Sequence, residues 1–151
     1  MDIKAEILKL KKNRFLRNDL EVNNFESAIE NIVSLNDVNL IKDLCAGFDD
    51  QTEDDEVMFG LIHAIEYYDG EKGLFEIAKA IPSMLPHAKG WATVLNYRIL
   101  NHEPSRRKYG DVLKKVDVVT KDLIVKILND IKEEDPARFE TSVNEVLSAL
   151  R

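Results

Sequence analysis

His63 and Glu66 are the residues whose types and spacing come nearest to a chemical site in this sequence. They stand three positions apart, so on a helix their side chains can meet on one face. A metal ion would need further His, Asp, Glu or Cys ligands within reach, and His87 and His102 lack ligand spacing. We therefore expect no metal. We predict instead a structural polar cluster of His63, Glu66 and Arg98, in which Arg98 gives the carboxylate a bidentate partner.

Covalent catalysis has no supporting motif in the chain. No Ser stands in a G-x-S-x-G turn, and no glycine-rich loop precedes a helix in P-loop form. Cys45 is the only cysteine, so no disulfide can form within the chain, and no His lies near it in the sequence. Its apolar context is typical of a small buried side chain on a helix. We therefore expect that the protein is not an enzyme and needs no cofactor.

The charge balance narrows the class of partner. The chain has 28 acidic and 21 basic residues, a net charge of −7 and an isoelectric point near 5.0. Nucleic acids and anionic membranes both favour Lys and Arg, so neither is an expected partner. A basic protein is the expected partner, because complementary charge speeds the encounter. The N-terminal segment alternates charged and apolar residues, which predicts neither a signal peptide nor an anchor, and we expect a cytoplasmic location.

An acidic run precedes the centre of the chain. Thr52 can cap a helix that starts at Glu53, and acids in a first turn oppose the helix dipole. Capping explains only part of the run. The remaining acids are either solvated loop charge or a surface for a basic partner. The run contains six acids, Asp49, Asp50, Glu53, Asp54, Asp55 and Glu56.

Three residues at the end of the same helix complete the predicted partner-binding set. Tyr67 and Tyr68 are followed by Asp69-Gly70, which ends the helix. Consecutive residues cannot both face one side of a helix, and an exposed Tyr beside acids is a common interface anchor. We therefore assign Tyr67, Tyr68 and Asp69 to the partner surface and Trp91 to the core.

Helical periodicity extends through the chain, and no strand is predicted. Pro82 and Pro86 predict a turn at residues 83–85, Gly47 is expected to end a helix in the left-handed conformation, and Asn23 or Asn24 and Thr120 are expected as caps. The helices at 24–33 and 37–45 should form an antiparallel hairpin. The nine expected segments are residues 2–16, 24–33, 37–45, 53–68, 71–80, 87–101, 104–116, 120–131 and 136–150.

These elements predict an all-α protein with a single domain over residues 1–151. Eight or nine short helices in stacked antiparallel hairpins would form either a HEAT-like α-solenoid or a compact bundle. A chain of this length buries roughly 70% of its unfolded surface, so its core needs no disulfide or metal.

The middle third of the chain resembles a known family. The ordered set of H-A-I-E at 63–66, Trp91 and Y-R-I-L-N at 97–101 is similar to the all-helical immunity proteins of bacterial polymorphic-toxin systems, including contact-dependent growth inhibition. The resemblance implies a small cytoplasmic protein that binds and neutralises a cognate toxin domain, often a nuclease.

The acidic charge of the chain is consistent with binding to such a toxin. A toxin that binds RNA or DNA has a basic cleft, which an acidic surface can occlude in a stoichiometric complex. The alternative is an α-solenoid adaptor in another bacterial assembly. The toxin's identity, the covered site and the oligomeric state stay open at this stage.

Overall fold

A computed structural model describes all residues from 1 to 151. It contains eight α-helices, one short 3₁₀ helix and no strand, which confirms the all-α prediction. The elements are α1 (Ile3–Lys12), α2 (Asp19–Val33), η1 (Val38–Leu40), α3 (Ile41–Cys45), α4 (Asp55–Glu66), α5 (Gly70–Asn101), α6 (Glu103–Leu113), α7 (Val118–Glu134) and α8 (Pro136–Ser148).

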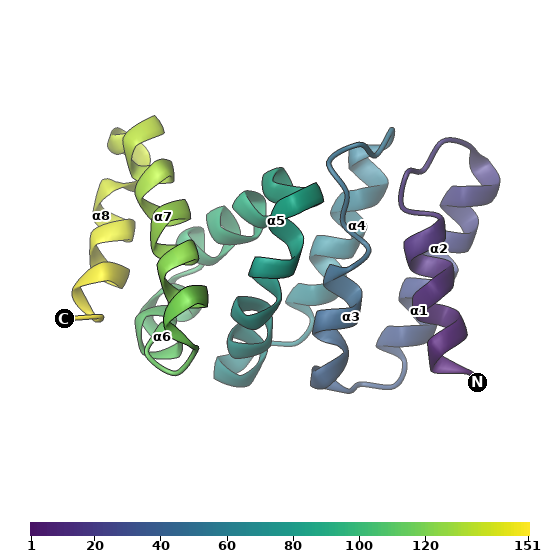
Figure 1. Ribbon diagram of the computed structural model, residues 1–151, viewed down its shortest axis with the longest axis horizontal. Helices are drawn as coiled ribbons and strands as arrows, with labels where there is room; N and C mark the ends of the chain where they lie inside the picture. Colours follow the sequence, from purple (N-terminus) through teal and green to yellow (C-terminus); the bar gives the residue numbers. More distant parts are fainter.

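The helices stand side by side in a row that runs from the N-terminus at one end to the C-terminus at the other (Figure 1). Within the N-terminal half, α1 and α3 lie in front of α2 and α4, and α2 and α4 run in the same direction. The main packing pairs are α1 with α2, α2 with α4, α3 with α5, α5 with α6 and α7, α6 with α8, and α7 with α8. This is an open array of stacked helices, the solenoid form of the two predicted architectures.

One contiguous hydrophobic core of 36 buried residues runs along this row. Its largest fully buried side chain is Tyr109, on α6. The Tyr109 hydroxyl donates to Asn96 Oδ1 at 2.7 Å, and Asn96 Nδ2 donates to the Ala92 carbonyl at 2.8 Å. The Tyr109 hydroxyl and the Asn96 amide are therefore paired inside the core, so their burial does not leave a lost hydrogen bond.

Side-chain caps start six of the eight α-helices, but several lie at other residues than predicted. The predicted start at Asp135-Pro136 is confirmed, since Asp135 accepts a hydrogen bond from Arg138 N. The caps predicted at Asn23 or Asn24, at Thr52 and at Thr120 are wrong. Each true cap stands two to six residues away from the predicted residue, at a position that the hydrophobic periodicity alone does not locate. The true caps are Asn18 for α2, Asp54 for α4 and Asp117 for α7.

Helix α5 corrects the predicted turn at residues 83–85. The helix continues past Pro82 and Pro86 and bends at Ala88, whose φ of −142° and ψ of 39° are not helical. Each proline removes one backbone donor, which favours a break nearby. Beyond the bend, the indole of Trp91 is buried. Its ring lies 5.9 Å from the Phe48 ring and 5.4 Å from the Phe59 ring, between centroids.

The predicted hairpin of the second and third helices is also wrong. Helix α2 packs against α1 and α4, whereas α3 packs against α5. A left-handed residue follows α2 at Asn36, and none occurs at Gly47. Gly47 is required for a different reason, because a Cβ there would lie 2.9 Å from the Leu10 side chain.

Candidate partner-binding surface

The predicted polar cluster is an ion pair between two helices. Arg98 donates from Nε to Glu66 Oε2 at 2.9 Å and from Nη2 to Glu66 Oε1 at 2.8 Å. The hydrogen bond to Glu66 raises the pKa of the Arg98 guanidinium. His63 is exposed and makes no hydrogen bond to either residue, and its ring lies beside Phe59. No group of three or more His, Cys, Asp or Glu is placed to hold a metal ion.

Three of the six acids in the run act inside the fold. The Asp49 side chain is buried, with Oδ2 at 3.3 Å from Arg14 Nε. Asp50 accepts hydrogen bonds from Gly90 N and Trp91 N, directly after the bend of α5. Asp54 Oδ1 accepts from Val57 N at 3.0 Å and so caps α4. Buried and capping carboxylates stabilise this fold, so these three are poor candidates for contact with a partner.

The other three acids of the run remain available at the surface. Glu53, Asp55 and Glu56 are exposed, and none of them forms an ion pair or a side-chain hydrogen bond within the chain. They cluster at the start of α4. Because no ion pair within the chain neutralises them, an external cation would relieve their mutual repulsion.

The two tyrosines differ in exposure. Tyr67 is 64% exposed, whereas Tyr68 is 8% exposed and belongs to the core, where burial raises the pKa of its hydroxyl. The prediction that Tyr68 faces outward is therefore wrong, because the chain turns at the end of α4 and draws it inward. Asp69 is exposed. With a rise of 1.5 Å per residue, Tyr67 stands about 16 Å along α4 from Glu56, so the predicted set occupies two ends of one helix.

A groove between α2 and α4 lies along the part of α4 between these two ends, and we refer to it as the α2–α4 groove. Its volume is about 460 Å³. Four half-buried apolar side chains form its floor, and the exposed Glu26 and Glu30 stand on its α2 wall. The lining residues are Glu26, Ile29, Glu30, Val33, Ser34, Val57, Gly60 and Ala64.

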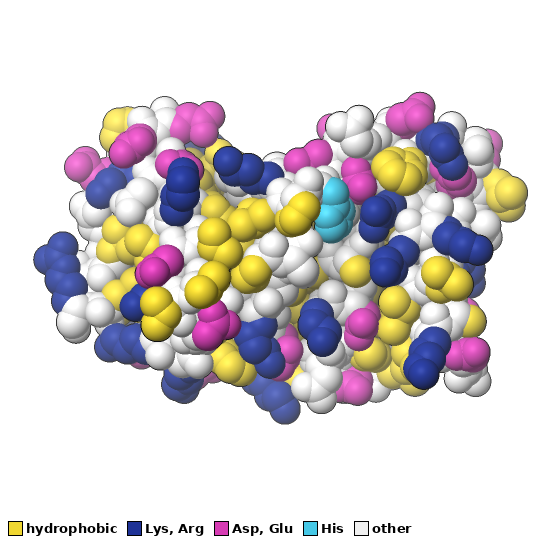
Figure 2. Space-filling model, in the orientation of Figure 1, with side chains coloured by type: hydrophobic (Ala, Val, Ile, Leu, Met, Phe, Trp, Pro, Cys, Tyr) yellow, Lys and Arg dark blue, Asp and Glu magenta, His cyan; other side chains and the backbone are white.

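The charges of the chain are divided unevenly around this groove. Residues 18–71 contain fifteen acids and a single base, Lys42, whereas the rest of the chain contains thirteen acids and twenty bases. Neither α2 nor α4 contains Lys or Arg. Lys42 lies on α3, in the front layer, and the front face shows Lys and Arg side chains spread over both halves of the molecule (Figure 2). The walls of the α2–α4 groove therefore carry charge of one sign only.

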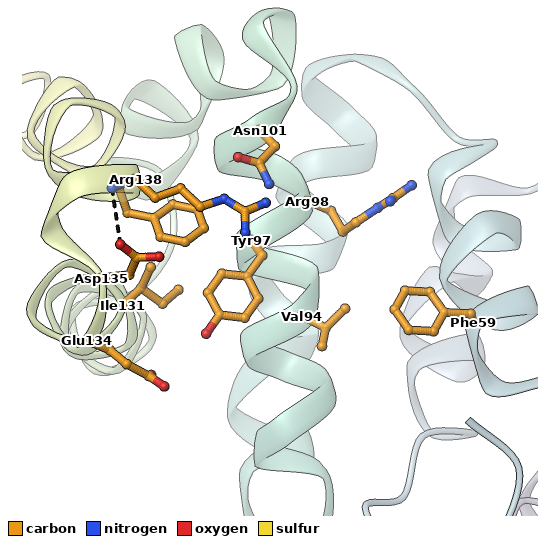
Figure 3. Close-up of a pocket in the computed structure, with 10 residues that line it drawn as sticks. Phe59, Val94, Tyr97, Arg98, Asn101, Ile131, Glu134, Asp135 and Arg138 are labelled. Atoms are coloured by element: carbon orange, nitrogen blue, oxygen red, sulfur yellow. Dashed lines mark hydrogen bonds between the residues drawn. The ribbon is translucent and has the colours of Figure 1, made fainter. Parts of the chain in front are cut away.

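A second pocket, of about 530 Å³, lies on the other flank of α4 (Figure 3). It is formed by Phe59 of α4, the last turns of α5 and the junction of α7 with α8. Arg98 and Arg138 line it together with Glu134 and Asp135, so its charges are mixed. Asp135 accepts the backbone hydrogen bond of Arg138 that starts α8, and Arg98 is paired with Glu66. These polar groups are already engaged, which makes this pocket the weaker binding candidate.

The sequence reasoning missed the α2–α4 groove, because it did not place α2 beside α4. Two signals in the sequence point to it: the near absence of Lys and Arg from residues 18–71, and a glycine at position 60 within a helix.

The structure contains no helix that is both long and apolar enough to cross a membrane.

Comparison with known proteins places the chain in a family. No curated protein and no solved structure matches it. The sequence model of one family, described as Immunity protein 30 (Imm30), matches residues 12–109, which include α2, α4 and the whole α2–α4 groove. The match extends over more than half of the chain, and the protein therefore belongs to the Immunity protein 30 family.

Proposed function

We propose that this protein protects a bacterial cell by binding a cognate toxin domain in the cytoplasm and occluding it in a stoichiometric complex. The observation that carries the proposal is the uneven charge distribution, with a surface over α2 and α4 that has exposed acids and no base. Membership of an immunity family supports a toxin as the partner.

The charge also suggests the class of toxin. A nuclease that acts on RNA or DNA needs Lys and Arg in its cleft to hold the phosphate backbone. Glu53, Asp55 and Glu56 are exposed and unpaired at one end of α4, and Tyr67 is exposed at the other. We propose that these residues face the toxin's basic cleft. The three carboxylates would compete there with the nucleic acid for the toxin's Lys and Arg side chains.

Co-expression with a toxin tests this function directly. The C-terminal toxin domain encoded beside this gene should arrest growth when it is expressed alone. Growth should resume when this protein is co-expressed, and an affinity tag on either chain should recover a one-to-one complex. A toxin that still arrests growth and yields no complex would remove the proposed function.

Charge reversal tests the surface. Glu53→Lys, Asp55→Lys and Glu56→Lys together should slow association at low salt by about tenfold or more, because steered encounters depend on complementary charge. Asp54 is left intact because it caps α4. The matched control is Asp122→Lys, Glu133→Lys and Glu140→Lys, which changes net charge equally on α7 and α8, where all three residues are exposed. An equal effect of both triple variants would show that only net charge matters.

A further inference from the structure

We propose that the α2–α4 groove receives an amphipathic helix of the toxin that presents an apolar stripe flanked by Lys and Arg. This inference rests on the proposed function and adds the binding mode and the chemistry of the partner segment. The groove has the elements of helix-in-groove recognition, an apolar floor and an acidic wall on α2 formed by Glu26 and Glu30.

Gly60 is the first observation that favours a close-packed occupant. Glycine in the interior of a helix is less stable than alanine, and a neighbour too close to admit a Cβ is one reason for a glycine there. At Gly73 and Gly110 that reason is internal, because a Cβ would overlap Tyr68 O or the Ala149 side chain. At Gly60 a Cβ would meet nothing within 4 Å. The fold itself therefore does not require this glycine, whereas a neighbour that packs closely against α4 from outside would require it.

The surroundings of Gly60 fit a helix as that neighbour. Ala64 follows one turn later on the same side of α4, and both residues line the groove. Small side chains at this spacing allow two helix axes to come closer than the usual 8–10 Å. Val57 on α4 and Ile29 and Val33 on α2 supply the apolar contacts on either side.

The walls determine the charge of the occupant. Glu26 and Glu30 are exposed on α2, Glu56 is exposed at the start of α4, and none of them has an ion-pair partner within the chain. An acidic or neutral segment would leave these carboxylates unpaired as the groove closes, whereas Lys and Arg would pair with them. Single- or double-stranded nucleic acid is repelled by the same walls.

Filling the groove is the decisive experiment. In Gly60→Leu the new Cβ meets nothing within 4 Å, and the rest of the side chain extends into the groove that Gly60 lines. The affinity of this variant for the purified toxin domain, measured by calorimetry, should fall by about 30-fold or more, the loss expected at the centre of an interface. The unfolding midpoint should stay unchanged or rise. Thr141→Leu, on the exposed side of α8, is the matched control and should bind as the wild type does.

The outcomes separate the two proposals. If Gly60→Leu binds as tightly as the wild type, the groove is not the toxin site, although the immunity function stands. If the wild type forms no complex with the toxin, both proposals fail.

Cross-linking then identifies the occupant. Ser34 lines the groove, and the only native thiol, Cys45, is buried, so Ser34→Cys can carry a photoreactive label selectively. Mass spectrometry should find one toxin segment that has Lys or Arg and apolar residues at helical spacing. A cross-link to an acidic segment, or to a second copy of this chain, would overturn the proposed occupant.

Discussion

Asp50 Oδ2 accepts a hydrogen bond from Gly90 N at 2.9 Å, across forty positions of the sequence. Oδ1 of the same carboxylate lies 3.3 Å from Trp91 N, and Asp50 N donates to the His87 carbonyl at 2.9 Å. The bend at Ala88 leaves backbone donors without helical acceptors, as at the start of any helix. Asp50 therefore caps the second part of α5 from a distant loop, and this contact fixes where Trp91 packs.

Asp50→Ala should destabilise the protein by about 1 to 2 kcal/mol, the loss expected for a helix cap. Urea unfolding followed by circular dichroism measures the change, and Trp91 fluorescence reports on the bend itself. Glu53→Ala in the same acidic run is the control, because the Glu53 side chain forms no ion pair or hydrogen bond within the chain, and it should change stability by less than about 0.5 kcal/mol. Equal effects of the two variants would show that the cap contributes nothing.

The Glu66–Arg98 pair should contribute little to stability despite its bidentate geometry. Their side chains are 36% and 43% exposed, and pairs in contact with solvent typically contribute less than about 1 kcal/mol. A double-mutant cycle with Glu66→Ala and Arg98→Ala isolates the coupling, which should shrink as salt is added. A coupling of several kcal/mol that is insensitive to salt would show that the pair is effectively buried.

Local patterns predicted much of the fold. Hydrophobic periodicity identified nearly every helix, and the Asp135-Pro136 start was found because cap and proline are adjacent in sequence. The roles of the acids were not predictable in this way. Asp49 is paired with Arg14 from the N-terminal end of the chain, and Asp50 with Gly90 from a later helix. Such roles depend on which segments the tertiary fold brings together.

The candidate site likewise combines features that local sequence predicts with features that only the tertiary fold determines. Tyr67 and Tyr68 have the same chemistry and adjacent positions, and only the path of the chain after α4 decides that Tyr68 is buried. The α2–α4 groove depends on α2 lying beside α4, although α3 lies between them in sequence. A local pattern carries no information about that adjacency.

The Glu21 carboxyl should titrate far below its ordinary range. Hydrogen bonds from the Arg17 side chain and from Arg17 N lower the pKa of Glu21 from 4.5 to about 2. The pair therefore stabilises the fold fully above pH 4.5, and this contribution is lost as the pH falls toward 2. NMR titration of the Glu21 side chain measures the midpoint. Arg17→Gln should return it toward 4.5, and an ordinary midpoint in the wild type would contradict the pairing.

Cys45 should be inert in the folded protein. Complete burial raises the pKa of its thiol to about 12, so at pH 8 almost none is thiolate, the reactive form. Iodoacetamide at pH 8 should leave the native protein unmodified and label it rapidly in urea. Thr141→Cys provides an exposed thiol as the control and should react without urea. Rapid labelling of the native wild type would show that the α3 region opens.

Two glycines within helices should respond to alanine in opposite directions. Gly110→Ala places a methyl group against the Ala149 side chain and 2.9 Å from Val146 O, where α6 crosses the end of α8. The helices must then separate, which should destabilise the protein by about 1 to 3 kcal/mol. The methyl group of Gly60→Ala has no neighbour within 4 Å. This substitution should therefore stabilise the protein by about 0.5 to 1 kcal/mol, since alanine is the better helix former. Thermal unfolding of both variants measures the contrast, and a destabilised Gly60→Ala would mean that the fold itself requires Gly60.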